Sequence, residues 1–321
     1  MIKLRKILEN KLEGLSIQEL VDKFLKFDEK TLIFFDTETM GLTPEEEWCQ
    51  ITQIGIIMVD GSTMKDIKRI NIKVELNDYT RKFLDKTGPV RIAYEKSKAA
   101  KNSNMSVEQI LDMTKYFDNI PEKPATEARA IQLFKRVVEH AKNPIIIAQK
   151  ADFDMSFISV RGRKYGIQVQ RTPVMDTKKI AELFFIPAIM TLNDSKLIKS
   201  LKKFKLVKTK DIDAQPDNPI IKSKETEFDR YTDPVTGEEY LKIYYGHPSS
   251  SLGKLSPALL DKLDNWHDAL ADVRTMIAVF SKIIEFLREH PDLDITQHQA
   301  NAIRRVKSMA KKEVKKQEEN E

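Results

Sequence analysis

The chain contains almost no cysteine and no long apolar run. Cys49 is its single cysteine, so no disulfide can form within one chain, and no Cys/His zinc pattern exists. Charges interrupt the segment 1–15 every few residues, and no run approaches the roughly 18 apolar residues of a membrane span. We therefore expect no signal peptide, no membrane partner and a reducing, cytoplasmic setting, in a cell or, for a virus-encoded protein, in the host cytoplasm.

The charge balance is mildly basic. Charged residues make up 32% of the 321 residues, above the usual quarter, and the formal net charge is +5. This balance is compatible with a polyanionic partner and equally with an ordinary solvated surface. The apolar fraction of 41% is enough for a core, and the length suits one large domain with additions or two modest ones.

Short apolar strands alternate with amphipathic helices along most of the chain. Leu32–Phe35 is an apolar run that ends in acids, as expected for a strand buried on both faces. Two more strands follow across turn signals, which predicts a β-meander. The expected helices lie at 1–27, at 125–141, from about 153, from 177 and at 269–290, and the later strands lie at 51–59, 67–76, 145–148 and 173–175. This order predicts an α/β sheet with helices on both faces.

The segment 189–248 departs from this alternation. Seven lysines and no acid lie within 195–210, and the turn signal Asp233–Gly237 separates two aromatic runs, which predicts a β-hairpin. The lysines and aromatic rings suit a nucleic-acid contact, or the apolar residues between them anchor an amphipathic segment whose lysines face water. The lysine- and glutamate-rich segment 297–321 is expected to be a solvated helix that frays.

Two acids close the first strand. Asp36 and Glu38 are two residues apart, so on a strand both carboxylates point to the same face. They would emerge at the C-terminal end of a buried strand, where ligand sites of open α/β sheets lie. Neighbouring carboxylates repel unless a cation joins them, and hard oxygen ligands suit Mg²⁺ or Mn²⁺. The same pair also fits an ordinary strand-end turn with exposed acids.

A second acidic site follows the strand at 145–147. Asp154 stands beside Phe153, whose ring would anchor the backbone while the acid faces the cleft. Asp154 also fits a helix N-cap, and Asp152 is a competing candidate for the same role.

The sharpest segment is His267 to Asp272. Asp268 is expected to cap the helix that begins at Ala269, which places Asp272 in the first turn, facing the cleft. His267 would lie on the preceding loop, and a histidine with a pKa near neutrality can take a proton from water. A surface histidine before a capped helix is the alternative.

Together and in this order, these segments resemble the three motifs of the DEDDh (DnaQ-like) family of 3'→5' exonucleases. The residues that carry the resemblance are D-T-E-T-M-G at 36–41, F-D at 153–154 and H-x4-D at 267–272, with D-T-K-K-I-A at 176–181 and S-L-x-x-L at 251–255 as connecting segments. The resemblance implies a ribonuclease H-like fold, a mixed five-stranded sheet with one antiparallel strand, flanked by helices. The chain would then comprise a helical extension at 1–27, an exonuclease domain at 28–290 with an insertion at about 189–248, and a charged helix or tail at 291–321.

The resemblance also implies a role for each motif residue. Asp36 would bridge two divalent ions, Mg²⁺ or Mn²⁺. Glu38 and Asp272 would complete the shell of one ion, and Asp154 would hold the other. His267 would deprotonate the attacking water, and the product would be a nucleoside 5'-monophosphate. The residues expected to contact the terminal nucleotide are Thr37, Thr39, Met40, Gly41, Leu42, Lys150 and Phe153.

One motif position departs from the family pattern. Gln149 and Lys150 stand where His-Asn is common, and Lys150 would either contact a phosphate or slow turnover. The expected substrate is the 3' end of single-stranded DNA, with RNA as the alternative on the same fold. The rival of another class is a proofreading or nucleic-acid-binding subunit with weak catalysis, acting beside a polymerase or another replication protein. The sequence does not indicate the oligomeric state.

Overall fold

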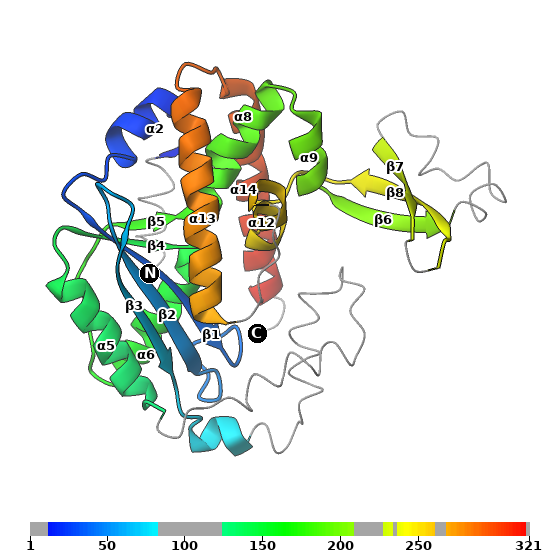
Figure 1. Ribbon diagram of the computed structural model, residues 1–321. Coiled ribbons are helices and arrows are strands. Elements are labelled where there is room, and N and C mark those ends of the chain that lie inside the picture. The colour runs from blue at the N-terminus through cyan, green and yellow to red at the C-terminus, as the bar shows by residue number, and fades with distance from the viewer. Residues whose placement is uncertain (1–11, 83–123, 209–226, 234–235, 261–267, 319–321) are drawn as a thin grey trace.

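A five-stranded sheet in the order β3-β2-β1-β4-β5 forms the centre of the protein (Figure 1). The computed structural model describes residues 12–82, 124–208, 227–233, 236–260 and 268–318. The strands are β1 (Thr31–Thr39), β2 (Ile51–Asp60), β3 (Asp66–Lys73), β4 (Pro144–Ala148) and β5 (Val174–Asp176). Strand β2 runs antiparallel to β1 and β3, whereas β4 is parallel to β1 and β5. The expected mixed sheet of ribonuclease H-like type, with one antiparallel strand, is confirmed.

Helices cover both faces of this sheet, which explains why β1 is apolar on both sides. Phe34 points into a core that it shares with α2 (Ile17–Phe24), α8 (Ile186–Thr191) and α13 (Ala269–Glu289). Phe35 points the opposite way, into a core formed with α5 (Glu127–His140) and α6 (Ala151–Lys164). All four residues of the Leu32–Phe35 run are fully buried, as the sequence predicts for a central strand. The remaining helical segments of this domain are α7 (Thr177–Ile180), the π-helical η2 (Ala181–Phe185) and α12 (Leu252–Leu260).

The predicted single helix at 1–27 is wrong in its described part. Gly14 has a φ of +79°, a left-handed conformation that ends one helical turn. Ser16 then starts α2 through a capping box with Glu19, in which each side chain accepts from the other's backbone N–H. The rest of that prediction, residues 1–11, lies outside the described residues.

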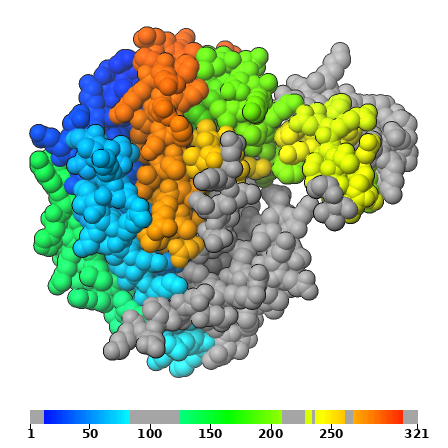
Figure 2. Space-filling view, in the orientation of Figure 1, coloured from blue at the N-terminus to red at the C-terminus, as the bar shows by residue number. Residues whose placement is uncertain are grey.

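A second, three-stranded sheet projects from the α/β domain (Figures 1 and 2). Its order is β6-β8-β7, formed by β6 (Lys203–Lys208), β7 (Glu227–Thr232) and β8 (Glu239–Tyr245), and α9 (Ser195–Leu201) leads into it. The predicted hairpin is confirmed as β7 and β8. The described part of the lysine-rich segment, 195–208, consists of α9 and β6, so it is not one amphipathic element.

The C-terminal helix α14 (Thr296–Glu318) is helical as expected, but one face of its first turns is buried rather than solvated. Gln299 and Ala302 are buried, because the helix packs against the core that includes α8. Among the helices of the described residues, none combines the length and the apolar character that a membrane span requires.

Candidate active site

The first strand extends beyond its parallel neighbour, which leaves its acidic end accessible from one edge. Pairing of β1 with β4 ends at Phe34 and Ile147, whereas pairing with β2 continues to Thr39. Asp36 and Glu38 therefore lie on a part of β1 that has no β4 partner, and both are half-buried. They project from the face of the sheet that α13 covers, since they alternate with Phe35 and Thr37 on the opposite face.

Helix α13 delivers a third carboxylate to this place. Asp36, Glu38 and Asp272 each offer a carboxylate oxygen, and these oxygens lie within 4.8 Å of one another. Asp272 lies in the first turn of α13 because Asp268 caps the helix, its Oδ1 accepting from the Ala271 backbone N–H at 3.0 Å. The expected cap and helix start are confirmed, and the structure brings together three of the acids that the sequence singles out.

Two residues of β2 hold α13 in this position. The Gln53 side chain is fully buried and donates from Nε2 to Asp268 Oδ2 at 3.0 Å. Gly55 lies opposite Asp36 in the β1–β2 ladder, and a Cβ there would come within 2.5 Å of the Ala269 carbonyl carbon. No motif in the sequence marks Gln53 or Gly55 as part of the site. The available signal was a glycine inside an isoleucine-rich strand, which often marks a close backbone approach.

Asp154 reaches the open edge of β1 from α6. Its side chain is buried, and Oδ1 accepts from Thr37 twice, from the backbone N–H at 3.0 Å and from Oγ1 at 2.6 Å. Asp154 thus accepts from the backbone N–H of Thr37, which lies beyond the pairing of β1 with β4. It is not the N-cap of α6, because Lys150 occupies that position, with a φ of +62° and no side-chain cap bond. Thr37 is itself buried, so its polar groups serve Asp154.

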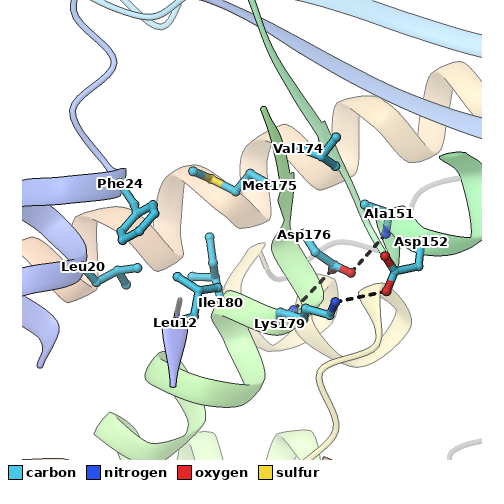
Figure 3. Close-up of a pocket in the computed structure, with 10 residues that line it drawn as sticks. All are labelled: Leu12, Leu20, Phe24, Ala151, Asp152, Val174, Met175, Asp176, Lys179 and Ile180. Atoms are coloured by element: carbon cyan, nitrogen blue, oxygen red, sulfur yellow. Dashed lines mark hydrogen bonds and ion pairs between the residues drawn. The ribbon is translucent and has the colours of Figure 1, made fainter. Parts of the chain in front are cut away.

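The competing acid Asp152 points elsewhere. It is exposed, and one of its oxygens accepts from Lys179 Nζ at 3.0 Å (Figure 3). The geometry therefore favours Asp154 over Asp152 as the acid that acts with Asp36.

The clustered acids shift one another's ionisation. Burial raises the pKa of Asp36 well above its usual range, and the charges of Asp154, Glu38 and Asp272 raise it further. Burial also raises the pKa of Asp154 to about 7, although the two hydrogen bonds from Thr37 oppose this shift. A cation would relieve the repulsion, and carboxylate oxygens are the donors that Mg²⁺ and Mn²⁺ prefer. The cluster therefore fits a divalent metal site.

Asp176 ties the start of α6 to the start of α7. Its carboxylate accepts from the backbone N–H groups of Lys150 and Ala151, both at 3.1 Å, and of Lys178 at 2.9 Å. Figure 3 shows the bond to Ala151. Burial raises the pKa of Asp176 to about 6. The hollow beside it measures about 60 Å³, much less than the roughly 300–1,000 Å³ of small-molecule sites. Asp176 therefore fixes the start of α6, the helix that carries Asp154, and its motif in the sequence did not predict this role.

The residues expected to hold a nucleotide differ in accessibility. Leu42 is 70% exposed, whereas Met40 is buried, so Leu42 is the side chain that can meet a base. The space beside Gly41 is filled by Cys49 and Trp48, so packing within the chain requires the glycine. Thr39 is also buried, and its Oγ1 donates to the Gly41 carbonyl oxygen at 2.8 Å.

Two further predicted nucleotide contacts, Lys150 and Phe153, lie at the start of α6. Lys150 is exposed, and its Nζ lies 5.6 Å from the centroid of the half-buried Phe153 ring. The Phe153 ring packs on Phe157 at a centroid distance of 5.1 Å, as expected of a local anchor. His267 lies outside the described residues.

No family model and no curated protein matches the chain. Among solved structures, E. coli exonuclease I in complex with a dT13 oligonucleotide matches with a TM-score of 0.43 and 16% identity, over 81% of this chain and 42% of that chain. The apo form of an exonuclease I matches with a TM-score of 0.42 and 15% identity, over 82% and 45%. Exonuclease I from Methylocaldum szegediense matches with a TM-score of 0.41 and 16% identity, over 82% and 41%. This chain spans less than half the length of each of these proteins, and likeness at this level does not assign an activity.

Proposed function

We propose that the protein is a metal-dependent 3'→5' exonuclease that hydrolyses phosphodiester bonds of single-stranded DNA and releases nucleoside 5'-monophosphates. The observation that carries the proposal is the convergence of Asp36, Glu38 and Asp272 within 4.8 Å, at the open edge of β1. These acids come from a strand and a helix that are far apart in the chain. They match the motifs from which the direction of hydrolysis and the product are inferred.

The acids divide into two groups by position. Asp36, Glu38 and Asp272 would hold one divalent ion, and Asp154 would join Asp36 at a second. Such ions, Mg²⁺ or Mn²⁺, stabilise charge on the phosphate oxygens of an in-line displacement when they are bound. Thr37 fixes the carboxylate of Asp154, and the cap at Asp268 fixes that of Asp272. The rigid strand and helix thus pre-organise the site.

The remaining chemistry requires a proton acceptor and residues that bind the terminal nucleotide. In this proposal an imidazole nitrogen of His267 takes the proton of the attacking water. Leu42 packs against the last base, since it is exposed and follows Glu38 by four residues in the chain. Lys150 would contact a phosphate, and its exposed position at the N-cap of α6 supports this role.

Digestion of end-labelled oligonucleotides tests the proposal. With 5'-labelled single-stranded DNA and Mg²⁺ or Mn²⁺, we expect a ladder that shortens from the 3' end, mononucleotide release, and no reaction in EDTA. Asp36→Asn and Asp154→Asn should each lower the rate by at least about a hundredfold, because each removes a metal ligand. A wild-type rate in either variant would contradict the proposed site.

Parallel digestions distinguish the alternatives. Faster cleavage of a matched RNA strand would make the protein an exoribonuclease, and double-stranded DNA tests the strand preference. Tight binding without mononucleotide release would instead indicate a binding or proofreading subunit.

A further inference from the structure

The small sheet β6-β8-β7 has two faces of different character. Side chains alternate along each strand, so the ladder registers assign every residue to one face. We call the face with Glu239, Leu241, Ile243 and Tyr245 the outer face. It also carries Lys203, Lys205 and Val207 from β6, and Phe228, Arg230 and Thr232 from β7. The opposite, inner face carries Tyr240, Lys242 and Tyr244 together with Asp229.

The inner face is occupied by contacts within the chain. Lys199 of α9 pairs with Asp229 at 3.2 Å. Lys254 of α12 lies over the Phe204 ring at 5.1 Å, and Lys242 lies over the same ring at 4.3 Å. Lys199 and Lys254 therefore attach this side of the sheet to α9 and α12, and Asp229 offsets one of the cations.

The outer face carries more cations than acids. Its ten described positions include Lys203, Lys205 and Arg230, all exposed, and a single acid, Glu239, which lies opposite Thr232. Phe228 is 54% exposed and Tyr245 is 47% exposed, so two rings stand open among these charges. An exposed mixture of cations and aromatic rings is typical of surfaces that bind single-stranded nucleic acid, because phosphates pair with the cations and bases stack on the rings.

Positive charge continues where this sheet joins the domain. His247, two residues after β8, lines a hollow of about 410 Å³ with His298, Arg304 and Arg305. None of the residues that line the hollow is an acid. Burial lowers the pKa of His247, and the charges of Arg305 and Lys202 lower it further, so this imidazole contributes little charge at neutral pH. Arg304 and Arg305 therefore supply the positive charge of this hollow.

We propose that the outer face of the small sheet binds single-stranded DNA through Lys203, Lys205 and Arg230, with its bases stacked on Phe228 and Tyr245. This assignment deepens the proposed function and relies on it for the identity of the strand, which would be held here while its 3' end enters the acid cluster. The occupant is single-stranded and polyanionic because, among the described residues, the face carries three exposed cations against one acid, and two open rings.

Binding measured without catalysis tests the assignment. The full-length protein is titrated against 5'-fluorescein-labelled dT30 in EDTA, and anisotropy is followed over a range of salt concentrations. K203Q/K205Q/R230Q should weaken binding and make the slope of log K against log salt shallower by about 2, since each phosphate contact on a single strand contributes about 0.7. The matched control K65Q/K68Q/R163Q also removes three exposed cations, on β3, its preceding turn and α6, and should leave the slope unchanged.

The rings are tested separately from the charges. F228L/Y245L should weaken binding roughly tenfold per ring without changing the salt slope, whereas F228Y/Y245F, which keeps both rings, should bind like the wild type. Equal weakening by the control triple variant, an unchanged slope in K203Q/K205Q/R230Q, or tighter binding of rU30 than of dT30 would overturn the assignment.

Kinetics separate this proposal from the proposed function. In Mg²⁺, K203Q/K205Q/R230Q should raise KM for a 30-mer and leave kcat/KM for a trinucleotide unchanged, because a trinucleotide occupies only the acid cluster. Normal dT30 binding by the outer face in a protein that lacks nuclease activity would refute the proposed function and keep the binding surface. Unchanged KM for the 30-mer in the triple variant would refute the surface and keep the nuclease.

Discussion

Gly55 lies directly opposite Asp36 in the β1–β2 ladder, and its missing side chain makes room for the first turn of α13. A Cβ at this position would meet the Ala269 carbonyl carbon at 2.5 Å. The same turn of α13 carries Asp272. The distance between two acids of the cluster therefore depends on a glycine that bears no functional group.

Gly55→Ala should reduce nuclease activity more than it reduces stability. The added methyl group pushes α13 from β2 and moves Asp272 away from Asp36. Such overpacking costs about 1–3 kcal/mol of unfolding free energy, and a displacement of about 1 Å at a reacting centre costs up to roughly a hundredfold in rate. Gly162→Ala is the matched control, because its Cβ would meet the Ile167 carbonyl oxygen at 2.7 Å, at the far end of α6. Thermal unfolding and kcat of both variants check this, and equal activity losses at equal stability would contradict it.

Gln53→Met should loosen the start of α13. The substitution keeps the volume but removes the amide that donates to Asp268 and to Asn71 Oδ1. We expect a loss of about 1–3 kcal/mol in unfolding free energy, since a buried acceptor loses its partner, and a fall in kcat of roughly tenfold. Asn71→Ala removes only the bond that Gln53 Nε2 donates to Asn71 Oδ1, so it should lower the unfolding free energy and kcat by less. A Gln53→Met protein with wild-type kcat would show that Gln53 does not position Asp272.

The metal-free protein should lose stability as the pH rises from about 4 to about 7. The pKa of Asp154 is raised from 3.8 to about 7 in the folded state, so the folded protein binds more protons than the unfolded chain in this window. The stability is highest below pH 4 for this group and falls until the pH passes 7. In EDTA, Asp154→Asn should flatten this part of the profile and unfold at a higher temperature than the wild type at pH 8.

Divalent ions should offset this loss of stability at high pH. Mg²⁺ or Mn²⁺ competes with protons for the carboxylates, so the rise in Tm on adding either ion should be larger at pH 8 than at pH 5. Differential scanning fluorimetry at both pH values checks this. A metal-induced shift of the same size in Asp154→Asn would place the ions elsewhere.

Asp176→Ala should weaken two helix starts at once. The carboxylate accepts from donors on α6 and on α7, so its removal should cost about 2 kcal/mol or more of unfolding free energy, compared with about 1 kcal/mol for a single cap. Asp194→Ala is the matched control, because Asp194 caps only α9 by accepting from Leu197. Asp176→Ala should also lower kcat, since α6 carries Asp154, whereas Asp194→Ala should not. Urea unfolding and initial rates measure the two effects.

The sheet and its acids could be predicted because their signals are local. An apolar run of four residues before Asp36 predicts a buried strand whichever helices cover it, and Asp268 predicts a helix start from its own preference for N-caps. The N-terminal helix was predicted too long because Gly14, which ends a turn at positive φ, interrupts an otherwise regular apolar pattern. The predicted solvation of 297–321 was wrong for one face at its start, because α14 packs there against α8, more than a hundred residues earlier in the chain.

The sequence by itself determined which acids the protein has and in which order they come. It also determined that each acid follows a strand or starts a helix, because the periodicity of apolar residues and the capping of helices depend on neighbouring residues. Only the tertiary structure decided that Asp154 rather than Asp152 reaches β1, and that Gln53 and Gly55 hold α13. It also decided that Lys203, Lys205 and Arg230 share one face of the small sheet. These properties depend on strand register and on contacts between residues distant in the chain, which a linear pattern does not specify.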